Sequence, residues 1–250
     1  MTTSFPSQAQ ESSESRGRAI IEKHKETNRG YASQITLGEM TLIGKNGSVE
    51  ATREFEHRLL EERGTTGEKS LLKILKPADL SGTNLLSWSH RDKSDDQWIY
   101  LPALKKTRRI AGSGKTGRFL GSEFTFEDLL PIPIEKYRYR YLSEGTCDGT
   151  LCDLVEATPL FSDSGYSKII IHVRRDNQQN NQIDFFDKKG ILKKEAHFSD
   201  IRKVNGRFYR SYKVVMKDLS SGRESRFTTR KIELEKGLTD DDFTQLKMER

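Results

Sequence analysis

The chain has 250 residues, enough for one large domain with a continuous core; 33% are hydrophobic and 32% are charged. No stretch approaches the roughly 18 apolar residues that cross a bilayer, and no apolar segment marks a signal peptide at the N-terminus. The formal net charge is +6, but bases and acids are interleaved along most of the chain. This pattern favours solvated sheet faces over a nucleic-acid groove, so we expect no nucleic-acid partner.

Residues 1–15 are polar and aperiodic, which predicts a disordered lead before a single domain over residues 16–250. Within the lead, Phe5-Pro6-Ser7-Gln8-Ala9-Gln10 is similar to the small-residue stretch that follows a secretory signal peptide. We therefore expect an exported, mature chain whose original start has been replaced. A short amphipathic helix is predicted over Ser15–Asn28, ending near Gly30.

After Tyr31 the hydrophobic period changes from helical to strand-like. Two runs around Ile35 and Val49 flank the turn Lys45-Asn46-Gly47, and further short runs follow at regular spacing up to Leu234. Many short strands separated by turn residues predict an antiparallel meander that closes into a barrel or half-barrel. A last short helix is predicted from Thr239, its N-cap. The later strands are expected over residues 71–75, 85–90, 97–101, 106–110, 137–142, 151–158, 166–173, 183–186, 192–198, 208–216 and 224–234.

The two cysteines of the chain, Cys147 and Cys152, flank an Asp-Gly turn signal between two strand-like runs. This spacing places both thiols across the mouth of a hairpin, close enough for a disulfide, and a disulfide supports export. The alternatives are two unpaired thiols in a reducing cytosol, or a metal site. A metal site is poorly supported because no second pair of ligands accompanies the cysteines, and we predict none.

Residues Gly112–Thr116 resemble a phosphate-binding loop without its context. The loop requires a glycine where Arg109 stands, and it must open a helix, whereas the following residues are poor helix formers. We therefore predict no nucleotide binding and no cofactor. The five histidines are scattered, and no combination of nucleophile and base is visible, so an enzyme is the least favoured class.

The segment from Trp98 to Phe126 concentrates large apolar side chains, the adjacent arginines Arg108 and Arg109, and a glycine-rich loop. An apolar cavity with a cationic lip suits an acyl chain that carries an anionic head group. Strand alternation puts Trp98 and Tyr100 on one face and Ile99 and Leu101 on the other, and the sequence leaves open which set lines the cavity. The candidate ligand-binding residues are Trp98, Tyr100, Leu101, Arg108, Arg109, Phe119, Leu120, Phe124 and Phe126.

These same blocks resemble the outer-membrane lipoprotein-sorting protein family, the LolA-like periplasmic carriers, in its branch associated with RND-type exporters. Leu120 stands where methionine is expected and Glu123 where aspartate is expected, both mild departures. The resemblance covers most of the chain after Ser15. The matching blocks are residues 76–83, 98–104, 108–111, 119–129, the Cys147 hairpin, 185–190 and 238–244.

The resemblance implies a mainly β fold, an incomplete (half-open) antiparallel β-barrel of about eleven strands capped by short helices around an apolar cavity. It implies a carrier or exporter-accessory protein of the periplasm, for lipoprotein sorting or lipid transport. Its ligands would be lipid or lipoprotein acyl chains, and its partner would be an RND-type inner-membrane exporter. The alternative is a periplasmic sensor that reads mislocalised lipoproteins and signals to a protein partner.

Overall fold

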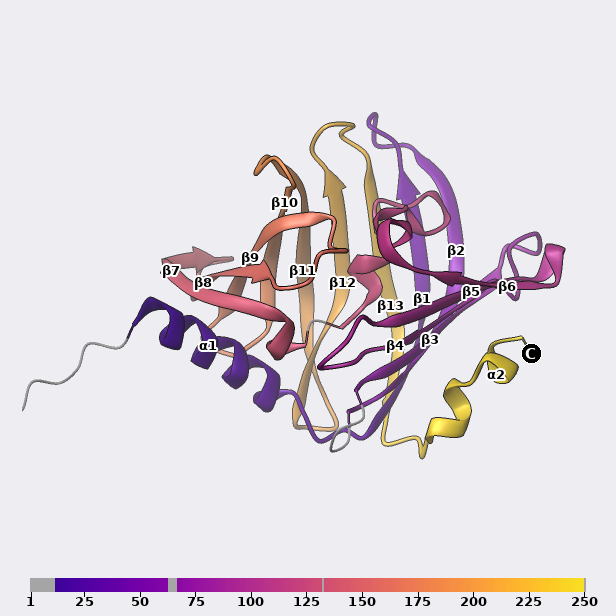
Figure 1. The fold of residues 1–250 in the computed structure, drawn as a ribbon, viewed down its shortest axis with the longest axis horizontal. Helices are drawn as coiled ribbons and strands as arrows, with labels where there is room; N and C mark the ends of the chain where they lie inside the picture. The colour runs from indigo at the N-terminus through magenta and orange to yellow at the C-terminus, as the bar shows by residue number, and fades with distance from the viewer. Residues whose placement is uncertain (1–11, 63–66, 132, 250) are drawn as a thin grey trace, which may run out of the picture.

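A computed structural model describes residues 12–62, 67–131 and 133–249 (Figure 1). Thirteen strands form one continuous sheet in the order β6-β5-β4-β3-β2-β1-β13-β12-β11-β10-β9-β8-β7. The strands are β1 Ser33–Ile43, β2 Val49–Leu60, β3 Lys69–Lys76, β4 Asn84–Trp88, β5 Asp96–Leu101, β6 Lys106–Ile110, β7 Tyr137–Cys147, β8 Thr150–Pro159, β9 Tyr166–Arg174, β10 Asn180–Asp187, β11 Leu192–Val204, β12 Phe208–Asp218 and β13 Glu224–Leu234.

All neighbouring strands pair antiparallel, and the sheet curves without closing. Strands β6 and β7 lie at its two ends and do not pair with each other in the described part of the chain. The predicted incomplete antiparallel barrel is therefore confirmed, with thirteen strands rather than about eleven. Each strand expected from hydrophobic period is present, because period-two patterning and turn residues act over a few residues at a time.

Helix α1 (Ser13–Thr27) runs along β7 and β8, in indigo at the lower left of Figure 1. Its first turn is capped by Ser12, whose Oγ accepts a hydrogen bond of 3.1 Å from the amide of Ser15. It begins inside the segment predicted as a disordered lead; residues 1–11 of that lead lie outside the described residues. None of the helices in the described residues is long and apolar enough to span a membrane.

The chain ends in a short 3-10 helix η6 (Asp240–Phe243) and helix α2 (Gln245–Met248), which pack over β3 and β4. The predicted N-cap is confirmed: the amide of Thr239 donates to the Asp242 carboxylate at 2.9 Å, and the Asp242 amide donates to the Thr239 carbonyl at 3.0 Å. The remaining 3-10 helices are η1 Pro102–Leu104, η2 Gly112–Thr116, η3 Phe119–Gly121, η4 Glu127–Leu129 and η5 Ile134–Lys136.

The two faces of the sheet carry separate cores. The outer face holds an apolar cluster under the C-terminal helices, which includes Leu71, Leu86 and Phe243. The inner face holds two larger clusters, one beneath β7–β12 and α1, the other around β1–β5. Alternation along each strand supplies both faces, because successive side chains point to opposite sides of the sheet.

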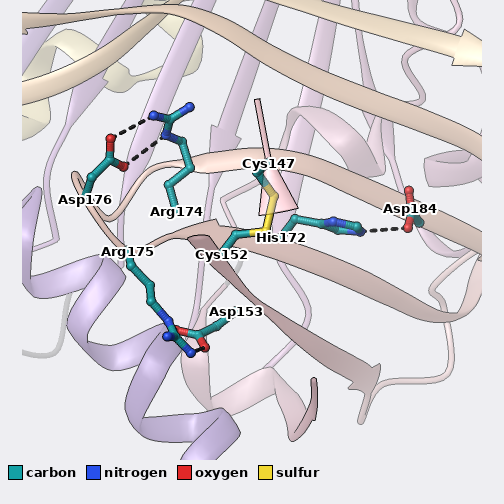
Figure 2. Close-up of a disulfide and its surroundings, with 8 residues drawn as sticks. All are labelled: Cys147, Cys152, Asp153, His172, Arg174, Arg175, Asp176 and Asp184. Carbon is teal, nitrogen blue, oxygen red and sulfur yellow. Dashed lines mark hydrogen bonds and ion pairs between the residues drawn. A yellow bond between two sulfur atoms is a disulfide. The ribbon is translucent and has the colours of Figure 1, made fainter. Parts of the chain in front are cut away.

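The predicted disulfide is present between Cys147 at the end of β7 and Cys152 in β8, with a Cα–Cα distance of 5.9 Å (Figure 2). Asp148 and Gly149 form the turn between them with φ of 47° and 77°, left-handed values that glycine adopts without strain. Figure 2 also shows His172 of β9 beside the two sulfur atoms, with its Nε2 at 3.0 Å from the Asp184 carboxylate.

Candidate functional site

A cavity of about 400 Å³ is lined by inner-face residues of the sheet and by residues of the segment 117–131, which we name the crossing segment. The crossing segment contains η3 and η4 and follows β6 in the chain. Most of the cavity wall is apolar. The apolar and aromatic lining residues are Phe55, Leu59, Leu72, Leu85, Phe124, Leu129, Leu130, Pro131, Tyr137, Tyr166, Ile169, Ile183, Phe185, Ala196, Phe198, Val214, Met216, Phe227 and Ile232.

Two acidic residues fasten the crossing segment to the sheet. Asp128 forms a buried ion pair with Lys194 of β11, and the Tyr166 hydroxyl donates to the same carboxylate at 2.7 Å. Glu127 accepts from the amide of Gly165 at 2.7 Å and from the Ser164 hydroxyl, while burial raises the pKa of its carboxyl above the ordinary value. Because these bonds are shielded from water, they hold the cavity wall in one position.

One end of the cavity is polar. It is formed by Gln34 of β1, His57 of β2, Glu68 just before β3, and Arg210 of β12; we call these four residues the polar end. The order of the strands explains their meeting, since β1 lies between β2 and β13, and β12 follows β13. In β1 the inward positions change from polar Gln34 to apolar Met40 along the strand, so the sheet itself grades from polar to apolar.

Arg210 is held rigidly within this end. Its Nε donates to the Gln34 side-chain oxygen at 2.8 Å, its Nη1 donates to the Tyr209 carbonyl at 2.8 Å, and its guanidinium carbon lies 4.6 Å from the centre of the Tyr31 ring. Burial lowers the pKa of the guanidinium from its ordinary value. Within the described residues no carboxylate forms an ion pair with it, and its Nη2 has no hydrogen-bond partner.

His57 and Glu68 are half-buried ionisable groups whose side chains have no hydrogen-bond partner in the described ranges. Burial lowers the pKa of His57 to about 4, so the imidazole is neutral at pH 7. Burial also raises the pKa of Glu68 to about 7, against the attraction of Lys25 and with the help of the neighbouring Glu62 and Glu61. The polar end therefore offers a fixed cation beside a carboxyl that titrates near neutral pH.

Of the nine predicted ligand-binding residues, only Phe124 lines this cavity. Leu101, Phe119, Leu120 and Phe126 lie on the same inner face, in the cluster that supports the lining residues of β2–β4. Phe119 is fully buried there, with its ring centre 5.9 Å from that of Phe126. These four side chains therefore belong to the supporting cluster and are not lining residues of the cavity.

Trp98 and Tyr100 lie on the opposite face from Leu101 and Ile99, as strand alternation predicts. They pack under the C-terminal helices, where the Trp98 ring is 4.9 Å from that of Trp88. The Trp88 indole donates to the Phe243 carbonyl at 2.8 Å and ties the helices to the sheet. Sequence alone left open which of the two pairs faces inward. Trp98 and Tyr100 lie on the outer face of the sheet, and Ile99 and Leu101 lie on the inner face.

Arg108 and Arg109 lie in β6, at the edge of the sheet, and both are exposed. Arg109 pairs with Asp96 of the neighbouring strand β5. Neither arginine is a lining residue of the cavity, so the cation that the structure places there is Arg210 instead. Its signal in the sequence is faint: an inward-facing charge in the alternation of β12, without any motif.

Two further groups of residues resemble a nucleotide-binding loop and a metal site in their composition. Residues 112–116 form η2 rather than a helix of the phosphate-binding type, and the buried Lys115 donates to Asp163 at 2.9 Å. The absence of nucleotide binding stays a prediction. In the described part of the chain, one group of three potential metal ligands is found, Cys147, Cys152 and His172, but its two sulfur atoms are bonded to each other.

Comparison with known proteins shows which families share this architecture. A family model described as "Uncharacterized protein" matches residues 66–250. No curated protein matches the chain. A crystal structure of a domain from Vibrio parahaemolyticus, assigned to the outer membrane lipoprotein-sorting proteins, is 32% identical over 94% of this chain and 99% of that chain, with a TM-score of 0.89.

Two other solved structures are similar. A DUF1329 family protein from Desulfovibrio piger is 27% identical over 95% of this chain and 100% of that chain, with a TM-score of 0.89. A LolA superfamily protein from Nitrosomonas europaea is 21% identical over 92% of this chain and 97% of that chain, with a TM-score of 0.71, a likeness of fold. The fold of the half-open sheet is therefore shared with these proteins.

Proposed function

Because this chain belongs to the LolA-like family of outer-membrane lipoprotein-sorting proteins, we propose that it is a periplasmic carrier or exporter-accessory protein that binds lipid or lipoprotein acyl chains. The observation that carries the proposal is the apolar cavity under the crossing segment. Its volume of about 400 Å³ falls within the range of roughly 300–1,000 Å³ typical of small-ligand sites. An inner-membrane exporter of the RND type is the partner that the family resemblance suggests.

Apolar burial would supply the affinity, at roughly 25 cal/mol for each Å² removed from water. The proposed role involves no covalent chemistry. The wall of the cavity is mostly apolar, as a binding site for an acyl chain requires. Binding and release of an unchanged ligand suit this wall better.

A pair of adjacent valines provides the test. Val214 lines the cavity, whereas Val215, the next residue of β12, points to the other face of the sheet. We expect Val214→Trp to fill the cavity and to weaken uptake of a fluorescent fatty-acyl probe by at least about tenfold, which is 1.4 kcal/mol. Val215→Trp is the matched control and should bind like the wild type.

Thermal unfolding of both variants checks that each is folded before the probe is added. Failure of the wild-type protein to take up the probe, or equal weakening by both tryptophans, would contradict a ligand site in this cavity.

A further inference from the structure

The polar end presents a charge imbalance that the apolar carrier function leaves unexplained. Arg210 is a half-buried cation that lines the cavity and has no ion-pair partner among residues 12–62, 67–131 and 133–249. Removing an ionised side chain from water is costly unless an opposite charge or a set of hydrogen bonds compensates it. Gln34 and the Tyr209 carbonyl accept hydrogen bonds from two nitrogen atoms of the guanidinium, and Nη2 has no partner among the described residues.

We propose that the polar end binds the anionic head group of a lipid, with the acyl chain in the apolar part of the cavity, and that ionised Glu68 weakens this binding. This inference rests on the proposed function and narrows its ligand class. A guanidinium has a planar fork of donors that matches a carboxylate or a phosphate. Here the fork is already oriented by Gln34 and Tyr31, so little conformational entropy is lost on binding.

Glu68 is the natural counter-charge, yet it does not pair with Arg210. The two groups attract each other through space, but their charged atoms are not within the 4.0 Å of an ion pair. Burial keeps the Glu68 carboxyl protonated up to about pH 7, where its pKa lies. A protonated carboxyl can donate a hydrogen bond to an anionic head, whereas the ionised form repels it.

The other charged groups around the carboxyl of Glu68 are divided in sign. Lys25 of α1 and Arg210 favour its ionised form, while Glu61 and Glu62 after β2 oppose it. His57 remains neutral across the range from pH 5 to pH 8, because its pKa is about 4. Glu68 is therefore the group of the polar end whose charge changes near neutral pH.

The inferred ligand class differs from an acylated lipoprotein terminus, whose ester and amide groups carry no negative charge. The anionic head could be the carboxylate of a fatty acid or the phosphate of a phospholipid. Both would place oxygen atoms at Nη2 of Arg210 and a chain along the wall that includes Val214, Phe198 and Met216.

The test compares two probes with the same fluorophore and alkyl chain, one ending in a sulfonate and the other in a hydroxyl group. The sulfonate keeps its charge at every pH used. At pH 6 we expect the wild-type protein to bind the sulfonate at least about tenfold more tightly than the alcohol, the strength of a hydrogen-bonded charge pair. Arg210→Gln should remove this preference and retain binding of the alcohol.

Arg207→Gln is the matched control. It removes the same charge from an exposed turn three residues earlier, outside the cavity lining, and should keep the preference. Arg210→Lys retains the positive charge and should keep part of the preference for the sulfonate probe. This variant remains informative if Arg210→Gln fails to fold. Between pH 6 and pH 8, sulfonate affinity of the wild type should fall at least about fivefold, and Glu68→Gln should abolish that fall.

Competition identifies the head group. Displacement of the sulfonate probe by oleate assigns a carboxylate and displacement by lysophosphatidic acid assigns a phosphate, and either result supports the proposal. Equal displacement by a neutral monoacylglycerol, or equal affinity of the wild type for the two probes, would overturn it while leaving the carrier function intact. Binding of neither probe would instead refute the carrier function itself.

Discussion

At the scale of residues, the charge of the polar end depends on ionisable side chains that are partly removed from water. Burial displaces the pKa of His57 to about 4 and that of Glu68 to about 7, so both are held toward their neutral forms. Arg210 cannot be neutralised in this way, because a guanidinium stays protonated in proteins. The residue that must find an anion is therefore the arginine.

The same displacement makes folding stability depend on pH. The folded protein holds the Glu68 proton up to about pH 7, whereas the unfolded chain releases it near the ordinary value of 4.5, so the free energy of unfolding falls as pH rises between them. The loss due to Glu68 is at most about 3 kcal/mol. His57 acts in the opposite direction, since stability rises with pH from about 4 to its ordinary value of 6.5.

Urea unfolding from pH 5 to pH 8 separates the two groups. We expect Glu68→Gln to gain stability relative to the wild-type protein as pH rises from about 5 to about 7, with little further relative change between pH 7.5 and pH 8. A constant difference between the two proteins at every pH would show that Glu68 has an ordinary pKa.

At the scale of elements, the edge of the sheet gives a structural reason for the charged side chains of β6, and the packing of helix α1 gives one for Gly17. Strand β6 is an edge strand, and Lys106, Arg108 and Arg109 give it charged side chains that discourage pairing with another chain. The arginines Arg108 and Arg109, which sequence alone assigned to the rim of a ligand cavity, thus also have a structural role at the edge of the sheet. Its part in ligand binding stays a prediction.

Helix α1 docks on β7 through a close backbone approach at Gly17. A Cβ atom at this position would lie 2.6 Å from the Tyr141 amide nitrogen and 2.8 Å from the Arg140 carbonyl carbon. Next to it, Arg16 lies over the Tyr141 ring at 3.7 Å, and Ile21 enters the inner core. Only glycine permits this distance.

We expect Gly17→Ala to destabilise the protein by about 1–3 kcal/mol, although alanine is the better helix former, because the helix must move off β7. Chemical denaturation measures the loss. Gly114→Ala is the control: its new Cβ would meet only Ile110 Cγ2 at 3.7 Å, an ordinary contact, and should cost little. Equal stability of the Gly17→Ala and wild-type proteins would mean that α1 is not packed as described.

At the scale of the molecule, an open sheet of thirteen strands has two large faces, and the chain uses them differently. The outer face is covered in part by the C-terminal helices, and the inner face is covered by the crossing segment and α1. A composition of 33% hydrophobic and 32% charged residues suits this design, because a wide sheet exposes much of its area to water.

A cavity of about 400 Å³ lined by aromatic and aliphatic side chains should hold a lipid if the protein works in the periplasm as proposed. We expect native mass spectrometry of the protein, purified without detergent from its own envelope fraction, to show bound species that dissociate as anionic lipids. Val214→Trp prepared in parallel should carry much less of them. A wild-type spectrum of the ligand-free mass alone would argue against a resident lipid.

The sequence by itself determined the elements: period-two hydrophobicity gave the strand positions, Asn-Gly and Asp-Gly pairs gave the turns, and the pair Cys147 and Cys152 needed only its own hairpin. These features depend on backbone preferences over a few residues. Tertiary structure alone decided the site. Arg210 and Gln34, 176 residues apart, meet because β12 and β1 both flank β13, whereas the neighbours Trp98 and Leu101 part to opposite faces of one strand. Strand order and register follow from burial summed over the whole sheet, and no local segment contains that information.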